Sequence, residues 1–117
     1  MLLGYHKNLY RFITKLSFNY RNGDNCRLGD RGIDLIVQAE LPFITDLSLQ
    51  DNNITHRGVR SMGKCRWKDL KLIDLGENPI KNAGVKELIK NQWKNLERLY
   101  LCGIGLTDDG AKILAKG

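Results

Sequence analysis

Residues 44–54 read Ile-Thr-Asp-Leu-Ser-Leu-Gln-Asp-Asn-Asn-Ile, and this stretch decides the fold because the chain repeats its pattern. The pattern returns 26 residues later, over residues 70–80, as Leu-Lys-Leu-Ile-Asp-Leu-Gly-Glu-Asn-Pro-Ile. It returns after another 26 residues, over 96–106, as Leu-Glu-Arg-Leu-Tyr-Leu-Cys-Gly-Ile-Gly-Leu. An earlier copy begins at Ile13 and rejoins the register at Leu28, after an insertion of five residues. We therefore predict four repeats, which start near residues 13, 44, 70 and 96.

Each repeat is predicted to contain a short strand followed by a helix. In residues 47–49 apolar side chains alternate with a polar one, which is the period of a strand with one buried face. Each repeat then has a glycine followed by apolar residues at the spacing of a helix with one apolar stripe. Because no unit can bury its own strand and helix, the units are expected to stack, with parallel strands along one side and helices along the other. The glycine column consists of Gly32, Gly58, Gly84 and Gly110.

Polar residues near the predicted helix starts indicate helix caps. Asp30, Asn82 and Asp108 stand two residues before a glycine of that column. A side-chain oxygen at this position can accept a hydrogen bond from a free amide of the first helical turn. His56 occupies the same position in the remaining repeat and does not fit this pattern.

The segment 44–54 and its copies resemble the leucine-rich-repeat family, whose repeats follow the pattern Leu-x-x-Leu-x-Leu-x-x-Asn-x-Leu. The resemblance covers Tyr10 to Leu114, and the helical half of each repeat looks most like the ribonuclease-inhibitor-type subgroup. It implies an α/β fold: a short leucine-rich-repeat solenoid of four repeats, with parallel strands on the concave face and helices on the convex face. It also implies a scaffold for protein recognition inside cells. Ile104 replaces the asparagine of the family pattern, so we expect a looser last turn.

Length, composition and cysteine usage indicate one folded domain. With 117 residues, of which 42 % are hydrophobic and 27 % charged, residues 1–117 are expected to form a single leucine-rich-repeat domain, in which residues 1–12 are a partial N-terminal cap. No apolar run approaches the roughly 20 residues that a membrane span needs, and we expect no membrane association. Cys26, Cys65 and Cys102 are odd in number and widely spaced, which favours reduced thiols and a cytoplasmic protein.

The outward-facing residues of the predicted strands are the candidate binding site, because a parallel sheet with one open face offers a rigid surface to a partner. Leu72, Arg98 and Tyr100 are suitable contact anchors, and Asp46 and Asp74 add negative charge beside them. We therefore predict a non-enzymatic protein–protein interaction module, which could be one subunit of a larger assembly. The predicted partner-binding residues are Leu72, Asp74, Arg98, Tyr100, Asp46, Gln50 and Tyr20, of which Tyr20 belongs to an exposed loop formed by the insertion Asn19 to Arg27.

The net charge of +6 leaves a second class of function open. Basic residues fall on the predicted helices and on the turns after them, where they could contact phosphates. They show no interleaving with aromatic residues, and Trp67 and Trp93 occupy a repeat column where packing is expected. A basic subunit associated with nucleic acid or a ribonucleoprotein is therefore the alternative. The basic residues are Arg57, Arg60, Lys64, Arg66, Lys68, Lys86, Lys90 and Lys94.

The sequence contains no recognisable pattern for catalysis, metals or cofactors. His6, His56 and the cysteines are scattered over different repeats without the spacing of metal ligands. There is neither a Gly-x-Ser-x-Gly segment nor a phosphate-binding loop. We therefore expect no enzyme activity, no metal site and no cofactor.

Overall fold

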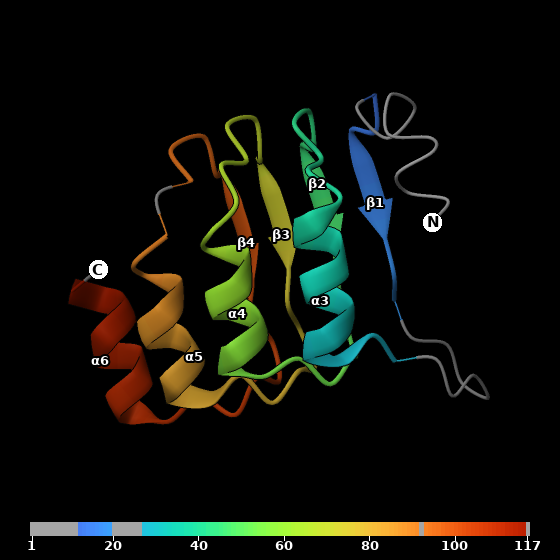
Figure 1. Cartoon of the computed structure of the whole chain (residues 1–117). Helices are drawn as coiled ribbons and strands as arrows, with labels where there is room; N and C mark the ends of the chain where they lie inside the picture. The colour runs from blue at the N-terminus through green and yellow to red at the C-terminus, as the bar shows by residue number, and fades with distance from the viewer. Residues whose placement is uncertain (1–11, 20–26, 92, 117) are drawn as a thin grey trace.

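The computed structural model describes residues 12–19, 27–91 and 93–116, and these form strand–loop–helix units that stand side by side (Figure 1). Strands and helices alternate along the chain from β1 to α6, so the predicted α/β architecture is confirmed. The strands are β1 (Lys15–Ser17), β2 (Asp46–Ser48), β3 (Leu72–Asp74) and β4 (Arg98–Tyr100). The helices are α3 (Gly29–Gln38), α4 (His56–Met62), α5 (Lys81–Leu88) and α6 (Asp108–Lys116).

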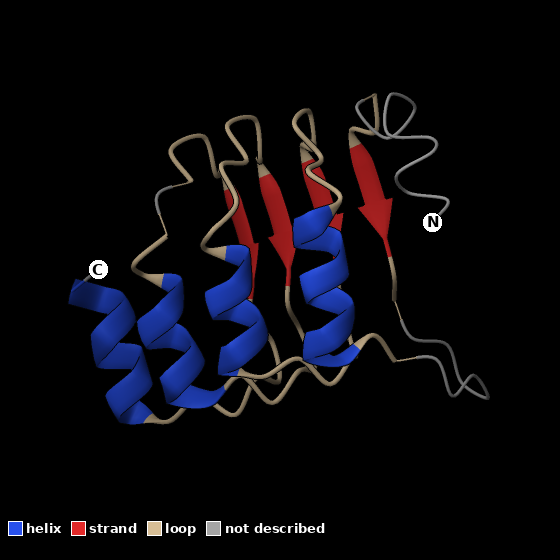
Figure 2. Cartoon of the chain, in the orientation of Figure 1, coloured by secondary structure: helices blue, strands red, loops and turns tan. Residues whose placement is uncertain are grey.

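The strands form one parallel sheet in the order β1-β2-β3-β4. Its register pairs equivalent repeat positions, so that Leu47 lies beside Leu16 and Ile73, and Ile73 lies beside Leu99. Figure 2 shows the described helices in a single layer on one side of this sheet. Equivalent residues in adjacent repeats are therefore about 4.8 Å apart along the sheet.

The apolar columns of the repeats form the core between the sheet and the helix layer. Leu47 and Leu49 of the second repeat and Ile73 and Leu75 of the third are all 0 % exposed. Val59, from helix α4, closes the same core from the other side and is also buried. Full burial of one such side chain stabilises the fold by about 1.5 to 3 kcal/mol, so the stacked columns provide the main driving force for folding.

Two buried asparagines hold the turns that follow β2 and β3. Asn52 and Asn78 are 0 % and 1 % exposed, and their side-chain amides bond to backbone groups of neighbouring turns. The Asn78 Oδ1 accepts from the backbone N–H groups of Asn52 at 2.8 Å and Ile54 at 3.0 Å. The Asn78 Nδ2 donates to the carbonyl oxygens of Leu49 and Leu75. These bonds satisfy turn groups that the sheet cannot pair, and they connect one repeat to the next.

The predicted caps at Asp30 and Asn82 are wrong in one respect: each side chain serves the following repeat. The Asp30 carboxylate accepts from the backbone N–H groups of Thr55 at 2.9 Å and Gly58 at 3.1 Å, and from the Thr55 hydroxyl at 2.5 Å. The Asn82 Oδ1 likewise accepts from the backbone N–H of Thr107, just before α6, while the Asn82 Nδ2 donates to the Thr107 hydroxyl oxygen. Helices α3 and α5 themselves begin without a side-chain cap. Because the helix starts of adjacent repeats lie close together, a side chain expected to cap its own helix instead bonds to the start of the next one.

Gly58 shows why a glycine column accompanies these bonds. A Cβ atom at this position would lie 2.6 Å from the Asp30 Oδ1 and 2.8 Å from the Ile54 Cγ2. Both distances are shorter than a van der Waals contact, so a larger residue would displace the carboxylate that caps α4. The glycine thus permits the close approach of α3 and α4.

Candidate interaction surface

The open strand face, defined as the outward side chains of β1 to β4, consists of two rows that cross the sheet. One row runs through Lys15, Asp46, Leu72 and Arg98, and the other through Ser17, Ser48, Asp74 and Tyr100. The described helices all lie on the other side of the sheet, so none of them covers this face (Figure 2). The register therefore brings together five of the predicted site residues: Asp46, Leu72, Asp74, Arg98 and Tyr100.

The anchors at the β4 end of this face are accessible to a partner. Tyr100 is 46 % exposed, Arg98 is exposed and Leu72 is half-buried. Leu72 pairs with Arg98 and Asp74 pairs with Tyr100, so an apolar, a cationic, an acidic and an aromatic side chain occupy neighbouring positions. Strand backbones hold all four, which reduces the entropy lost on binding.

Several polar residues on or beside this face form hydrogen bonds within the protein itself. The Asp74 Oδ1 accepts from the backbone N–H of Gly76 at 2.9 Å. The Asn19 Oδ1 accepts from the Ser48 hydroxyl at 2.8 Å and from the Gln50 backbone N–H at 3.1 Å. Gln50 follows β2 and lies beyond the paired rows. The Asn19 bonds attach the start of the inserted segment to the second repeat.

Tyr20 and most of the insertion from Asn19 to Arg27 lie outside the described residues. The predicted contribution of Tyr20 to the rim of the open strand face therefore stays a prediction.

Helices α4 and α5 carry basic residues that are partly neutralised by one carboxylate. The Glu87 Oε1 accepts from the Arg60 Nη2 at 3.1 Å, and the Lys90 Nζ lies 3.7 Å from the Glu87 Oε2. The hydrogen bond from Arg60 is the main reason that the pKa of Glu87 falls below its ordinary value, and the charges of Arg60 and Lys90 act in the same direction. This part of the helix layer is thus an exposed ion-pair network, which contributes little to stability.

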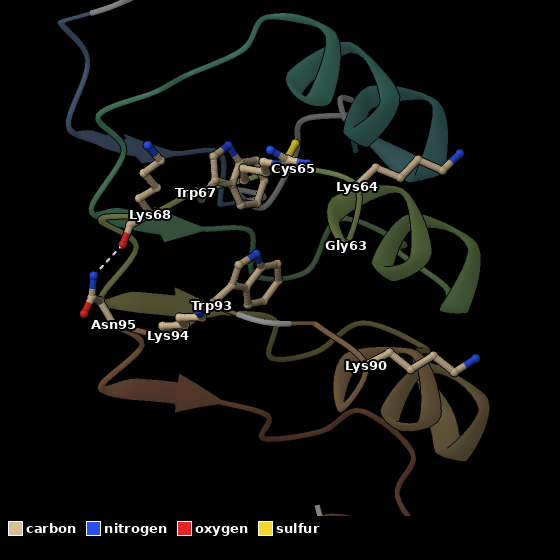
Figure 3. Close-up of a pocket in the computed structure, with 10 residues that line it drawn as sticks. Gly63, Lys64, Cys65, Trp67, Lys68, Lys90, Trp93, Lys94 and Asn95 are labelled. Carbon is tan, nitrogen blue, oxygen red and sulfur yellow. Dashed lines mark hydrogen bonds between the residues drawn. The ribbon is translucent and has the colours of Figure 1, made fainter.

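The turns after α4 and α5 form a cleft of about 710 Å³ that the sequence analysis did not anticipate. Trp67 and Trp93 stack inside it with ring centroids 5.9 Å apart and an interplanar angle of 29°. The predicted packing of both indoles is confirmed, because Trp67 is buried and Trp93 packs against the core. The expected absence of interleaving is wrong, because Trp67 lies between two of the cations in the sequence and Trp93 directly precedes another. The cations that line the cleft are Lys64, Arg66, Lys68, Lys90 and Lys94 (Figure 3).

Cys65 and Cys102 are free thiols in different environments. Burial and, to a smaller extent, the negative charge of Glu40 together raise the pKa of the Cys65 thiol to about 11. Cys65 is therefore a protonated, poorly nucleophilic thiol at neutral pH. Cys102 is exposed on the turn after β4. Among the described residues, no three His, Cys, Asp or Glu side chains are grouped so as to hold a metal ion.

A family model described as "Leucine Rich repeat" matches residues 40–63, which contain β2 and α4. The described residues form four parallel strands in one sheet that alternate with four helices, an α/β arrangement consistent with a short leucine-rich-repeat solenoid. The match supports the leucine-rich-repeat family, whose domains generally mediate protein–protein interaction and are typically non-enzymatic. A comparison with curated proteins gave no significant match. In the part of the chain that the structure describes, no helix has the length and apolar character needed to cross a lipid bilayer.

Proposed function

We propose that this leucine-rich-repeat chain is a non-enzymatic interaction module that binds a protein partner through its open strand face. The observation that supports this proposal is the group of Leu72, Asp74, Arg98 and Tyr100 on β3 and β4, held in register on a face that no described helix covers. Aromatic and arginine side chains on a rigid support are the residues that most often dominate binding energy at protein interfaces. The arrangement fits a subunit of a larger cytoplasmic assembly.

The charges on this face favour a protein over a nucleic-acid backbone. Asp46 stands beside Leu72, and Asp74 stands beside Tyr100 in the paired register. Two carboxylates among the anchors would repel phosphates, whereas a protein can complement both signs of charge. We also propose that the chain is of the ribonuclease-inhibitor-type subgroup, which is supported by the regular helix in each of its repeats.

Affinity purification from the native source, followed by titration of the recovered partner, tests this function. Tyr100→Ala should weaken binding by at least about 1 kcal/mol, which is about fivefold in Kd, because an exposed anchor is removed without loss of core packing. Lys90→Ala is the matched helix-side control and should have little effect except at low salt. If Lys90→Ala weakened binding more than Tyr100→Ala at physiological ionic strength, the proposed face would be wrong.

A different observation supports a second candidate function, a basic subunit associated with nucleic acid or a ribonucleoprotein. The cleft around Trp67 and Trp93 collects five cations on two adjacent turns. Binding to generic RNA that weakens steeply as salt rises would support this function, because phosphate contacts release counterions. Binding of a defined protein that tolerates salt would support the first function instead.

A further inference from the structure

The basic cleft, formed by residues 63–68, Lys90 and residues 93–95, combines one sign of charge with an aromatic floor. Its five lysine and arginine side chains are all exposed, and none of the described residues that line it is acidic, although Lys90 also lies 3.7 Å from the Glu87 carboxylate outside it. Lys64 and Lys90 are equivalent positions of adjacent repeats, as are Lys68 and Lys94. Figure 3 shows the two indoles between Lys68 and Lys94 on one side and Lys64 and Lys90 on the other. A ligand that enters the cleft therefore meets apolar rings with cations at both ends.

The two indoles form a fixed stack with one ring partly accessible. Both indoles line the cleft and pack against the core, but Trp67 is only 3 % exposed whereas Trp93 is half-buried. The Nε1 of Trp93 and the Nδ2 of Asn91 are buried, and neither has a hydrogen-bond acceptor among the described residues. A buried donor without an acceptor costs about 1 to 3 kcal/mol. Hydrogen bonds within the described residues therefore do not account for the burial of these two donor groups.

The preceding pair of turns provides an internal comparison. There, Val37 and residues 40–42 of one turn and residues 64–67 of the next form a smaller cleft of about 390 Å³. Glu40, Leu41 and Pro42 occupy the positions that correspond to Arg66, Trp67 and Lys68 one repeat later. The first repeat thus folds with an acidic residue and a proline at the positions of Arg66 and Lys68, and with a leucine at the position of Trp67. The basic and aromatic character of the later cleft is therefore not a requirement of the fold.

We propose that the basic cleft binds single-stranded nucleic acid, with phosphates at the lysines and a base against the accessible face of Trp93. This inference rests on the second candidate function and gives it a site that is separate from the open strand face. Non-specific single-strand binding combines a cationic groove along the backbone with aromatic rings on which bases stack. An acidic peptide would use the cations but not the ring, and a duplex has no free base faces.

Intrinsic fluorescence reports on this cleft directly, because Trp67 and Trp93 are the two tryptophans of the chain. The probes are a single-stranded RNA of about ten nucleotides, the corresponding duplex, an acidic peptide and inorganic polyphosphate. We expect the single strand to quench tryptophan emission and to bind at least about tenfold more tightly than the duplex or the peptide. Polyphosphate should bind with a smaller change in emission, because it has no base to stack.

Two sets of variants locate the binding. The double variant Lys64→Glu/Lys94→Glu should lose at least about tenfold in affinity for the single strand. Lys86→Glu/Lys112→Glu makes the same change in net charge at exposed positions of α5 and α6 outside the cleft, and should lose less than about threefold. Trp93→Leu introduces the residue found at Leu41 and should remove the preference for RNA over polyphosphate. Circular dichroism confirms that each variant is folded.

The outcomes separate the site from the function. If single-stranded RNA binds but emission is unchanged and both double variants lose affinity equally, the basic cleft is not the site, although association with nucleic acid stands. If no RNA binds at physiological ionic strength, the site and the second candidate function both fail. Tighter binding of the acidic peptide or the duplex than of the single strand would also overturn the proposal.

Discussion

The third and fourth repeats have the same apolar columns but bury them differently. In the third repeat Ile73 and Leu75 are 0 % exposed, whereas in the fourth Leu99 is 37 % exposed and Leu101 is half-buried. The third repeat packs against neighbours on both sides, and the fourth packs against one neighbour within the described residues. Burial in a solenoid therefore depends on the adjacent repeats as much as on the residue itself.

The turns that follow the strands of these two repeats also differ, because the third is held by more side-chain hydrogen bonds than the fourth. The side-chain amide of Asn78 makes five hydrogen bonds, of which three reach the second repeat and two stay within its own turn. Ile104 occupies the equivalent position and is buried at 1 % exposure, so its side chain contributes apolar contact in place of those bonds. Gly103 and Gly105 flank it with φ values of 71° and 79°. The last turn thus relies on glycine conformations and packing where the third relies on polar bonds.

The largest expected effect comes from placing a charge in the same column of each repeat. Leu75→Asp should destabilise the fold by at least about 4 kcal/mol and abolish the native circular dichroism, because it buries an unpaired carboxylate. Leu101→Asp should cost only about 1 to 2 kcal/mol, because water already reaches that side of the column. Urea unfolding followed by circular dichroism measures both. Equal losses would contradict the dependence of burial on neighbouring repeats.

Removal of the asparagine bonds should have the next largest effect. Asn78→Leu leaves the amides of Asn52 and Ile54 without their acceptor, and we expect a loss of about 3 kcal/mol in the free energy of unfolding. Asn95→Ala is the control, because exposed Asn95 donates only to the Lys68 carbonyl among the described hydrogen bonds, and it should cost less than about 1 kcal/mol. A small loss for Asn78→Leu would show that water replaces these bonds.

The cap that Asp30 provides for α4 should contribute less to the free energy of unfolding than the hydrogen bonds of Asn78. Asp30→Ala removes the acceptor for the amides at the start of α4, and we expect a loss of about 1 to 2 kcal/mol. Asp34→Ala removes a carboxylate of the same helix at an exposed position and should be close to neutral. Chemical denaturation of both variants distinguishes a cap from a general effect of charge. An equal response to the two changes would mean that Asp30 does not stabilise α4.

These contrasts show which features could be predicted from the sequence. The period of 26 residues was sufficient to predict the strand positions and the residues that share the open strand face, because register follows directly from the columns. The acceptor role of Asp30 for α4 could not be predicted, since it depends on how closely two helix starts approach. The basic cleft was missed for the same reason: Lys64 and Lys94 are far apart in sequence and line one cleft only after stacking. A search for charges at equivalent repeat positions would have found it.

The smallest expected effect is a difference in chemical reactivity between two cysteines, one on an inner turn and one on the turn after β4. Cys65, between the second and third repeats, has a pKa raised to about 11 from an ordinary 9.0, mainly by burial. A raised pKa keeps this acid neutral, so at pH 8 it carries about one hundredth of the thiolate expected at its ordinary value. Cys102, on the turn after β4, is exposed. Iodoacetamide at pH 8 should therefore modify Cys102 well before Cys65, as mass spectrometry of the peptides will show.

Because thiolate is the reactive form, the rate of modification at Cys65 should keep rising as the pH approaches 11. In urea the two rates should converge, since unfolding exposes both thiols. Equal rates in the native protein would mean that the inner turn is open to solvent, and the contrast between inner and outer repeats would then not extend to the turns.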